Sequence, residues 1–295
     1  MLWLFFALLE PVLHAFSNVL DNYLSNKMFK NVATLVFYST ITNVMFLPLV
    51  FLFKVPSMIS ISQVPFFIIL GFTGISYLYP YYKSLQNDDT SVVVSLFDLG
   101  RIFVPILAFF LVGEVLSVKQ YVGFLIIILA GAFLTFNIKN FHFNKSFYWM
   151  MLCSFIIAID VVIYKYIFNM VDWSTGFFWA TVFSFLFSIP LLFFPKIRFD
   201  IKKSYNKFKN GFKLFALEEF ITFAGQASLT FAVSLKSVTL VSAISSFQPI
   251  FVLFYGFILG KYFPGMFKEK SSLFDILKKL FLFIIMIFGV ILILN

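Results

Sequence analysis

The chain has 295 residues, of which 61% are apolar and 12% are charged, whereas an ordinary soluble domain is about 45–50% apolar and about 25% charged. Because a surface in contact with water cannot hold this excess of apolar side chains, the composition excludes a soluble globular protein and predicts an all-α integral membrane protein. The net charge of +9 does not indicate nucleic-acid binding, because nearly all Lys residues lie in short breaks between apolar blocks, where they are expected to meet lipid headgroups.

Apolar segments long enough to cross a bilayer follow one another along the chain. A helix needs roughly 20 apolar residues to span the hydrocarbon core, and short breaks with Lys, Asn, Asp, Ser, Pro or Gly separate these segments as turns do. Two breaks, 196–213 and 261–279, are longer and basic. We therefore predict about ten transmembrane helices, at 1–24, 31–53, 64–84, 90–112, 118–137, 146–167, 174–194, 212–234, 238–259 and 276–295.

The first predicted helix carries four polar side chains, Glu10, His14, Asn18 and Asp21. Their spacings of four, four and three place them on one stripe of a helix. Charged groups are costly inside a bilayer, so the stripe should face the protein interior or a watery cavity. Glu10 and His14 are candidates for substrate binding or for proton coupling. The alternative is a structural polar seam that holds helices together.

Four tyrosines gather at the end of the segment 64–84: Tyr77, Tyr79, Tyr81 and Tyr82. Tyrosines at such a position most often form an interfacial belt. Alternatively, they line a site for a flat or apolar substrate, and Tyr81 is a candidate contact.

The segment 90–112 carries Asp98 and Arg101, three residues apart and therefore able to form a buried ion pair. Arg presents a planar, permanently charged fork that suits a carboxylate or phosphate group. Arg101 is thus a candidate anchor for an anionic substrate, released to Asp98 when the site empties. The structural alternative is a pair that neutralises itself and fixes helix packing.

The second half of the chain repeats this region. With three residues of the turn at 87–89 removed, residues 84–114 align with 234–261 without further gaps. Five helices in each half predict two repeats, 1–140 and 141–295, inserted in opposite orientations, as in many secondary transporters. The aligned pairs include Ser84 with Ser234, Ser95 with Ser242, Arg101 with Gln248, and Gly113 with Gly260.

Residues 80–135 resemble the first half of an EamA-type protein of the drug/metabolite transporter superfamily. The resemblance rests on Gly113 and Glu114 at the end of the fourth predicted helix, and on Gln120 and Gly123 at the start of the fifth. The second half departs from the pattern, because Lys261 follows Gly260 where the family usually has Glu. The resemblance implies a ten-helix inverted repeat that exports or exchanges small solutes without ATP. We interpret Glu114 as a family marker solvated at a helix end, and not as a site residue.

Further polar residues lie within the apolar segments of the second half. Asp160 lies deep in the segment 146–167, while Lys165 is expected to reach the membrane interface. Glu218 and Glu219 are adjacent and point in different directions, so at most one should face a cavity while the other meets headgroups. Gln226 and Gln248 complete the set of candidates, since Gln248 is the repeat counterpart of Arg101.

The basic residues predict an orientation. Connectors after odd-numbered predicted helices hold 17 Lys or Arg residues, whereas those after even-numbered helices hold only Lys54, Lys119 and Lys236. Because positive loops stay in the cytoplasm, this bias places both termini outside. The family resemblance implies both termini inside. We favour the charge bias.

The sequence as a whole predicts a secondary transporter of the cell membrane that moves a small solute, with lipids and a coupling proton or ion as further partners. No ATP-binding loop, no zinc-hydrolase motif and no nucleophile elbow occurs, so we expect no enzyme activity, cofactor or bound metal. One alternative is an intramembrane enzyme that acts on a lipid-linked substrate with Glu10 and His14 as acid and base. Another is a membrane scaffold that transports nothing.

Overall fold

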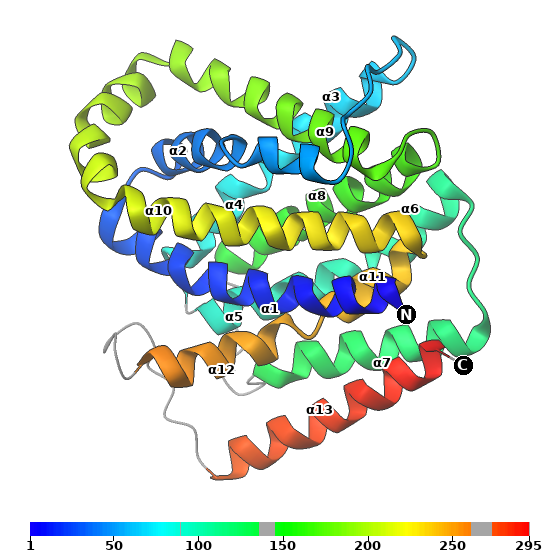
Figure 1. Ribbon diagram of the computed structural model, residues 1–295. Coiled ribbons are helices and arrows are strands. Elements are labelled where there is room, and N and C mark those ends of the chain that lie inside the picture. Colours follow the sequence, from blue (N-terminus) through cyan, green and yellow to red (C-terminus); the bar gives the residue numbers. More distant parts are fainter. Residues whose placement is uncertain (89, 136–144, 261–272, 295) are drawn as a thin grey trace.

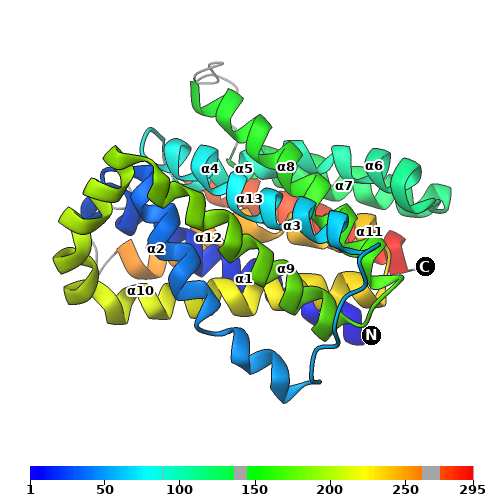
Figure 2. The ribbon, with the colours of Figure 1, turned by 90° about the horizontal axis from the view of Figure 1, so that it is seen from above.

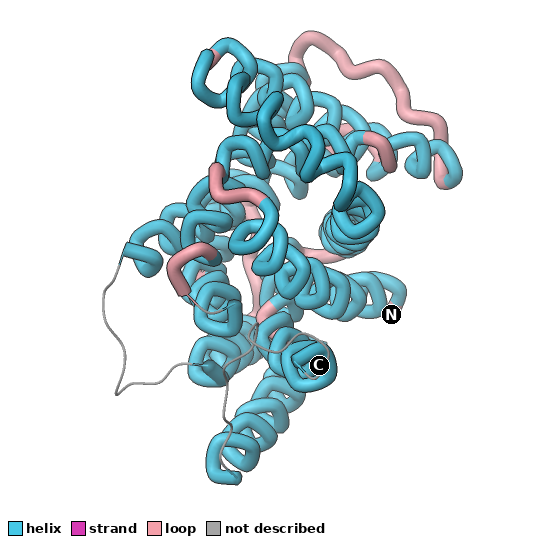
Figure 3. The backbone as a smooth tube through the Cα atoms, turned by 90° about the vertical axis from the view of Figure 1, so that its left-hand side faces the viewer, coloured by secondary structure: helices cyan, strands magenta, loops and turns pink. Residues whose placement is uncertain are grey.

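The computed structural model describes residues 1–88, 90–135, 145–260 and 273–294, and all regular structure in them is helical (Figure 1). Short loops join most of the helices (Figure 3). The elements are α1 (Leu2–Tyr23), the π-helical turn η1 (Leu24–Met28), α2 (Val32–Val44), the 3-10 turn η2 (Leu47–Leu52), α3 (Val64–Ser76), α4 (Leu78–Leu85), α5 (Thr90–Arg101), α6 (Phe103–Val112), α7 (Val118–Thr135), α8 (Lys145–Phe168), α9 (Trp173–Ser188), the 3-10 turn η4 (Ile189–Phe193), α10 (Pro195–Leu235), α11 (Val238–Ser245), α12 (Gln248–Gly260) and α13 (Leu273–Leu294).

These helices confirm an all-helical membrane fold. Within the described residues, six helical stretches are long and apolar enough to cross a membrane, and three further apolar helices, at Phe103–Val112, Val118–Phe133 and Phe281–Leu294, are shorter. The predicted number of ten spans and the inverted repeat remain predictions. The six stretches are Leu2–Met28, Val32–Leu52, Val64–Leu85, Lys145–Phe168, Trp173–Phe193 and Val238–Gly256.

The basic stretch 196–213 is not a loop between two helices, as the sequence analysis expected. It is continuous with the predicted span 212–234, and together they form the 41-residue helix α10. A straight helix of that length would measure about 60 Å, twice the thickness of a bilayer core, and Figure 1 shows that the ribbon instead bends round at the left of the view. The other basic connector, 261–279, lies partly outside the described residues.

The two segments related by the internal repeat are each interrupted. Residues 90–112 form α5 and α6 with a break at Ile102, and residues 238–260 form α11 and α12 with a break at Ser246 and Phe247. Side chains of α6 pack on α11 while those of α5 pack on α12, so the two interrupted segments lie against each other along their length.

Helices of the first half pack on helices of the second half throughout the molecule. The most extensive contacts join α13 with α7, α1 with α10, α3 with α9, and α5 with α8. Figures 1 and 2 show α7 and α13 side by side, with α1 beside α10. The interface between the halves is therefore the centre of the molecule.

Glycines allow two of these helix pairs to approach closely. A Cβ atom on Gly123 of α7 would lie 2.7 Å from the carbonyl oxygen of Gly289 on α13, and one on Gly100 of α5 would overlap the Cβ of Ser154 on α8. Small residues at these positions bring backbones together, as is usual in membrane helix pairs.

Large apolar side chains point away from the bundle. Phe110 is 76% exposed and Phe281 63% exposed, which suits lipid and not water. Both termini lie at the same end of the molecule, on the right in Figure 1, while the bend of α10 lies at the opposite end. An even number of membrane crossings gives this arrangement.

Candidate substrate cavity

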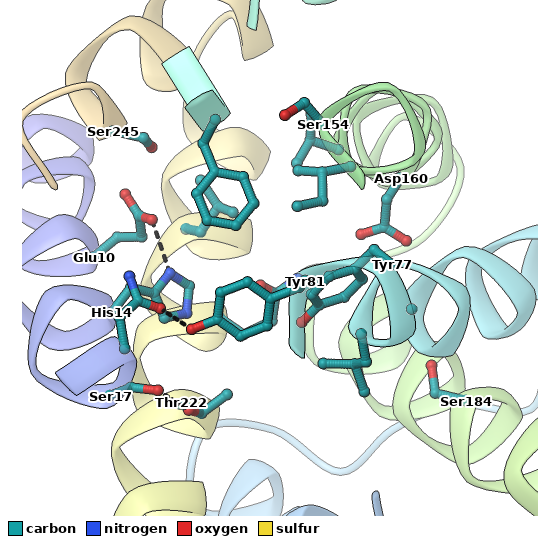
Figure 4. A pocket seen from close by; sticks show the side chains of 18 of the residues that line it. Glu10, His14, Ser17, Tyr77, Tyr81, Ser154, Asp160, Ser184, Thr222 and Ser245 are labelled. Atoms are coloured by element: carbon teal, nitrogen blue, oxygen red, sulfur yellow. Dashed lines mark hydrogen bonds and ion pairs between the residues drawn. The ribbon is translucent and has the colours of Figure 1, made fainter. Parts of the chain in front are cut away.

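A cavity of about 210 Å³ lies between the two halves of the chain (Figure 4). Helices of both halves contribute its walls, and its lining mixes carboxyl, hydroxyl and amide groups with aromatic and aliphatic side chains. The structure brings eight of the nine candidate residues to this one cavity: Glu10, His14, Asn18, Tyr81, Arg101, Asp160, Gln226 and Gln248. The ninth, Asp98, lies in α5, and its side chain is outside the described residues.

The polar stripe of α1 forms one wall, as its spacing predicted. Nδ1 of His14 lies 2.8 Å from Oε1 of Glu10, and the two share a hydrogen bond. Gly225 of α10 makes room for the imidazole, because a Cβ there would lie 2.5 Å from Cδ2 of His14. Glu10 is only 2% exposed, and no described side chain bonds its second oxygen, Oε2, or the amide nitrogen Nδ2 of Asn18.

Two tyrosines of α4 form hydrogen bonds with the C-terminal part of this stripe, Asn18 and Asp21. The hydroxyl of Tyr81 donates to Oδ1 of Asn18 at 2.6 Å and lies 3.0 Å from Oδ2 of Asp21, while the hydroxyl of Tyr82 reaches Oδ1 of Asp21. Tyr77 also lines the cavity. Of the four clustered tyrosines, only Tyr79 is exposed on the outer surface, so the group divides between cavity and membrane.

Both adjacent glutamates of α10 are buried, so the expectation that one of them meets lipid headgroups is wrong. Glu219 lines the cavity and accepts a hydrogen bond from the amide of Asn43 at 3.1 Å. Glu218 turns towards α1 and accepts from the hydroxyls of Ser17 and Thr222, at 2.8 and 2.7 Å. Of these polar partners, Ser17 and Asn43 come from distant parts of the chain, whereas Thr222 lies one turn along the same helix.

Asp160 faces the α1 stripe from the other side of the cavity (Figure 4). Its Oδ1 accepts a hydrogen bond from the hydroxyl of Thr73 on α3. Asp160 is 5% exposed, and no salt bridge involves it in the part of the chain that the structure describes.

Arg101 joins the two interrupted segments where their breaks meet. Nη1 donates to Oγ of Ser246 at 3.0 Å, and Nη2 donates to Oε1 of Gln248 at 3.2 Å. Arg101 and Gln248 are the residues that the internal repeat aligns with each other, so both repeat counterparts line the same cavity and bond directly.

Two residues at the helix ends have roles that the sequence analysis did not assign. The carboxylate of Glu114 accepts hydrogen bonds from the hydroxyl of Ser237 and from the backbone N–H groups of Val238 and Thr239. It therefore caps the N-terminus of α11 and is not simply solvated. Lys165 donates to the carbonyl oxygens of Val233 and Lys236, so it caps the C-terminus of α10.

The described residues contain no group of three or more His, Cys, Asp or Glu side chains placed to hold a metal ion. The buried carboxyl groups of the cavity are thus distributed around its walls and do not converge on one point.

A comparison with known protein families finds a match in the N-terminal half of the chain. The EamA-like transporter family matches residues 1–136. The first half of this chain is thus similar to proteins of that family. The match agrees with the resemblance seen in residues 80–135 of the sequence.

Comparison of folds covers the whole chain. A solved crystal structure, described only as that of a protein, matches with a TM-score of 0.60 over 96% of this chain and 95% of its own, at 16% sequence identity. At that identity the match shows a shared fold alone. No curated protein sequence matches the chain.

Proposed function

We propose that this protein is a secondary transporter that moves a small solute across the cell membrane by alternating access and without ATP. The observation that carries the proposal is the polar cavity between the two halves, where the interrupted segments α5–α6 and α11–α12 meet through Arg101 and Gln248. Secondary transporters commonly bind their substrate between inverted repeats, beside discontinuous helices.

The helix contacts support the inverted repeat. If α1 corresponds to α8, α2 to α9, α3 with α4 to α10, and α5 with α6 to α11 with α12, each contact between halves should have a counterpart. The pairing of α1 with α10 has its counterpart in α8 with α3 and α4, and that of α3 with α9 in α10 with α2. Likewise, the contact of α5 with α8 corresponds to that of α11 with α1, and the contact of α6 with α8 to that of α12 with α1. A two-fold relation between the halves accounts for these matched pairs.

The cavity residues then take separate roles. Glu10 and His14 serve as coupling or binding groups, because either changes charge with protonation. Asn18, Tyr81, Gln226 and Gln248 offer hydrogen bonds to the solute, while Asp160 contributes a carboxyl group from the second half. Arg101 holds the two breaks together, and Asp98 on the same helix remains a predicted partner for its charge.

Exchange in proteoliposomes tests this function. Purified protein is reconstituted without nucleotide into vesicles loaded with amines, amino acids, sugar phosphates or nucleotides, and uptake of the same labelled solute is followed by mass spectrometry. We expect exchange of one solute class by the wild type and weaker exchange by Arg101→Ala. Vesicles that exchange no solute but convert a lipid-linked one would favour the enzyme instead.

A further inference from the structure

We infer that the substrate of this cavity is an organic cation, an ammonium group carried on an apolar or aromatic body. The inference rests on the proposed transport function and names the chemistry of its solute. It draws on the charge balance of the cavity wall, on one unpaired buried carboxyl oxygen and on the aromatic side chains of the lining.

Acidic groups outnumber basic ones around the cavity. Among the described lining residues, Glu10, Asp21, Asp160 and Glu219 carry carboxyl groups, whereas Arg101 is the one cation with a permanent charge. The guanidinium of Arg101 is directed at the side chains of the helix break. A carboxylate that is ionised away from water needs a nearby positive charge, and a cationic solute supplies it.

The positive charge of the solute would lie beside the carboxyl group of Glu10. Glu10 lines the cavity, and its Oε1 is shared with His14, but its Oε2 is buried and has no partner in the described chain. A buried acceptor without a partner is unfavourable in a resting protein, and an N–H group of an ammonium ion satisfies it with a charge-assisted hydrogen bond. Asp160 faces the same space from the opposite wall (Figure 4).

Aromatic rings enclose this space. The ring of Tyr81 lies 5.1 Å from that of Tyr82 and 5.7 Å from that of Phe97, and all three line the cavity. The electron-rich faces of such rings attract cations. Aliphatic side chains such as Val104 and Leu229 complete the wall, which favours an organic cation over a hydrated metal ion.

Three probes of one skeleton test the inference: 2-phenylethylamine, 3-phenylpropionate and 2-phenylethanol, which are positive, negative and neutral near pH 7. Thermal unfolding of the purified protein in detergent reports binding, because a ligand of the folded state raises the melting temperature. We expect the amine to stabilise the wild type. In Glu10→Gln we expect its affinity to fall about tenfold or more, as the loss of a hydrogen bond to a charged group implies.

Asp172→Asn is the matched control, since Asp172 is a carboxylate outside the cavity that pairs with Lys54 at 3.0 Å. It should bind the amine as the wild type does. Asp160→Asn provides a second cavity variant in case Glu10→Gln does not fold. Preferential binding of the carboxylate, equal binding of all three probes, no binding of the amine, or wild-type amine affinity in both cavity variants would overturn the inference.

Proteoliposomes separate this inference from the transport proposal. If the amine binds but never exchanges across the vesicle membrane, the cation site stands and transport fails. If the carboxylate exchanges and the amine does not, transport stands and the cation site fails.

Discussion

Gly225 is the residue on which the position of His14 depends. Its hydrogen side chain lies against the imidazole, and any Cβ at this position would lie 2.5 Å from Cδ2 and 2.7 Å from Nε2 of His14. Because His14 in turn bonds Glu10, a single methyl group on α10 should move the pair of Glu10 and His14 without removing any of its atoms.

We predict that Gly225→Ala weakens amine binding about tenfold while the protein still folds, since overpacking costs about 1–3 kcal/mol. Gly211→Ala is the control on the same helix, because its Cβ would meet only the flexible end of Met28. Thermal-shift titrations of both variants measure the effect. Wild-type affinity in Gly225→Ala would show that the position of His14 does not matter.

Glu114 connects the two halves through three hydrogen bonds to the start of α11. We predict that Glu114→Ala lowers the free energy of unfolding by about 1–2 kcal/mol, the usual value of a lost helix cap. Thermal unfolding in detergent checks this, with Gln120→Ala as a control because Gln120 bonds only within its own turn in the described contacts. Equal melting temperatures of the wild type and Glu114→Ala would contradict the assigned role.

The spacing of polar residues along one helix predicted where some of these side chains lie, but it could not predict contacts between distant parts of the chain. The stripe of α1 follows from intervals of four, four and three along one helix, and the structure places it at the cavity. The partners of Glu114 lie 123 to 125 residues away in sequence, and Ser17, which bonds Glu218, lies 201 residues away. Neither the cap nor this contact of Glu218 therefore leaves a local pattern. The pairing of Asp98 with Arg101 remains a prediction, because the side chain of Asp98 is outside the described residues.

The bent helix α10 carries much of the charge bias that predicts the orientation of the protein. Its first half carries seven of the 17 basic residues of one end. Tyr38 of α2 stacks on Phe208 of this part with ring centroids 4.2 Å apart and donates a hydrogen bond to the carbonyl of Ile201. Apolar residues at 197, 201, 208, 212 and 215 follow helical spacing. That periodicity was the available signal for a helix, and the density of Lys obscured it.

The charge bias predicts that this end of the molecule lies in the cytoplasm. A cysteine at the exposed position Tyr205 should therefore resist membrane-impermeant thiol reagents in intact cells, whereas Ser60→Cys, in a connector at the other end, should react. The native Cys153 is buried and gives little background. Rapid labelling of Tyr205→Cys in intact cells would reverse the orientation and favour the topology that the family resemblance implies.

At the scale of the whole molecule, the two halves form one cavity that neither forms alone. Composition and segment length predicted the all-helical membrane fold, because both depend only on apolar content. The sequence repeat aligned Arg101 with Gln248, and the structure joins them by a hydrogen bond. The breaks at Ile102 and at Ser246 and Phe247 were not predicted, since no Gly occurs there and the two nearby prolines, Pro105 and Pro249, lie within the helices that follow.

Alternating access is tested most directly by measuring whether the cavity can be reached from each side of the membrane. Thr181 lines the cavity, and Thr181→Cys can be challenged with a small membrane-impermeant thiol reagent from either face of oriented proteoliposomes. We predict labelling from both faces, with 2-phenylethylamine slowing both reactions, and no labelling of the wild type. Labelling from one face only, with or without the amine, would contradict a transporter whose halves rock around this cavity.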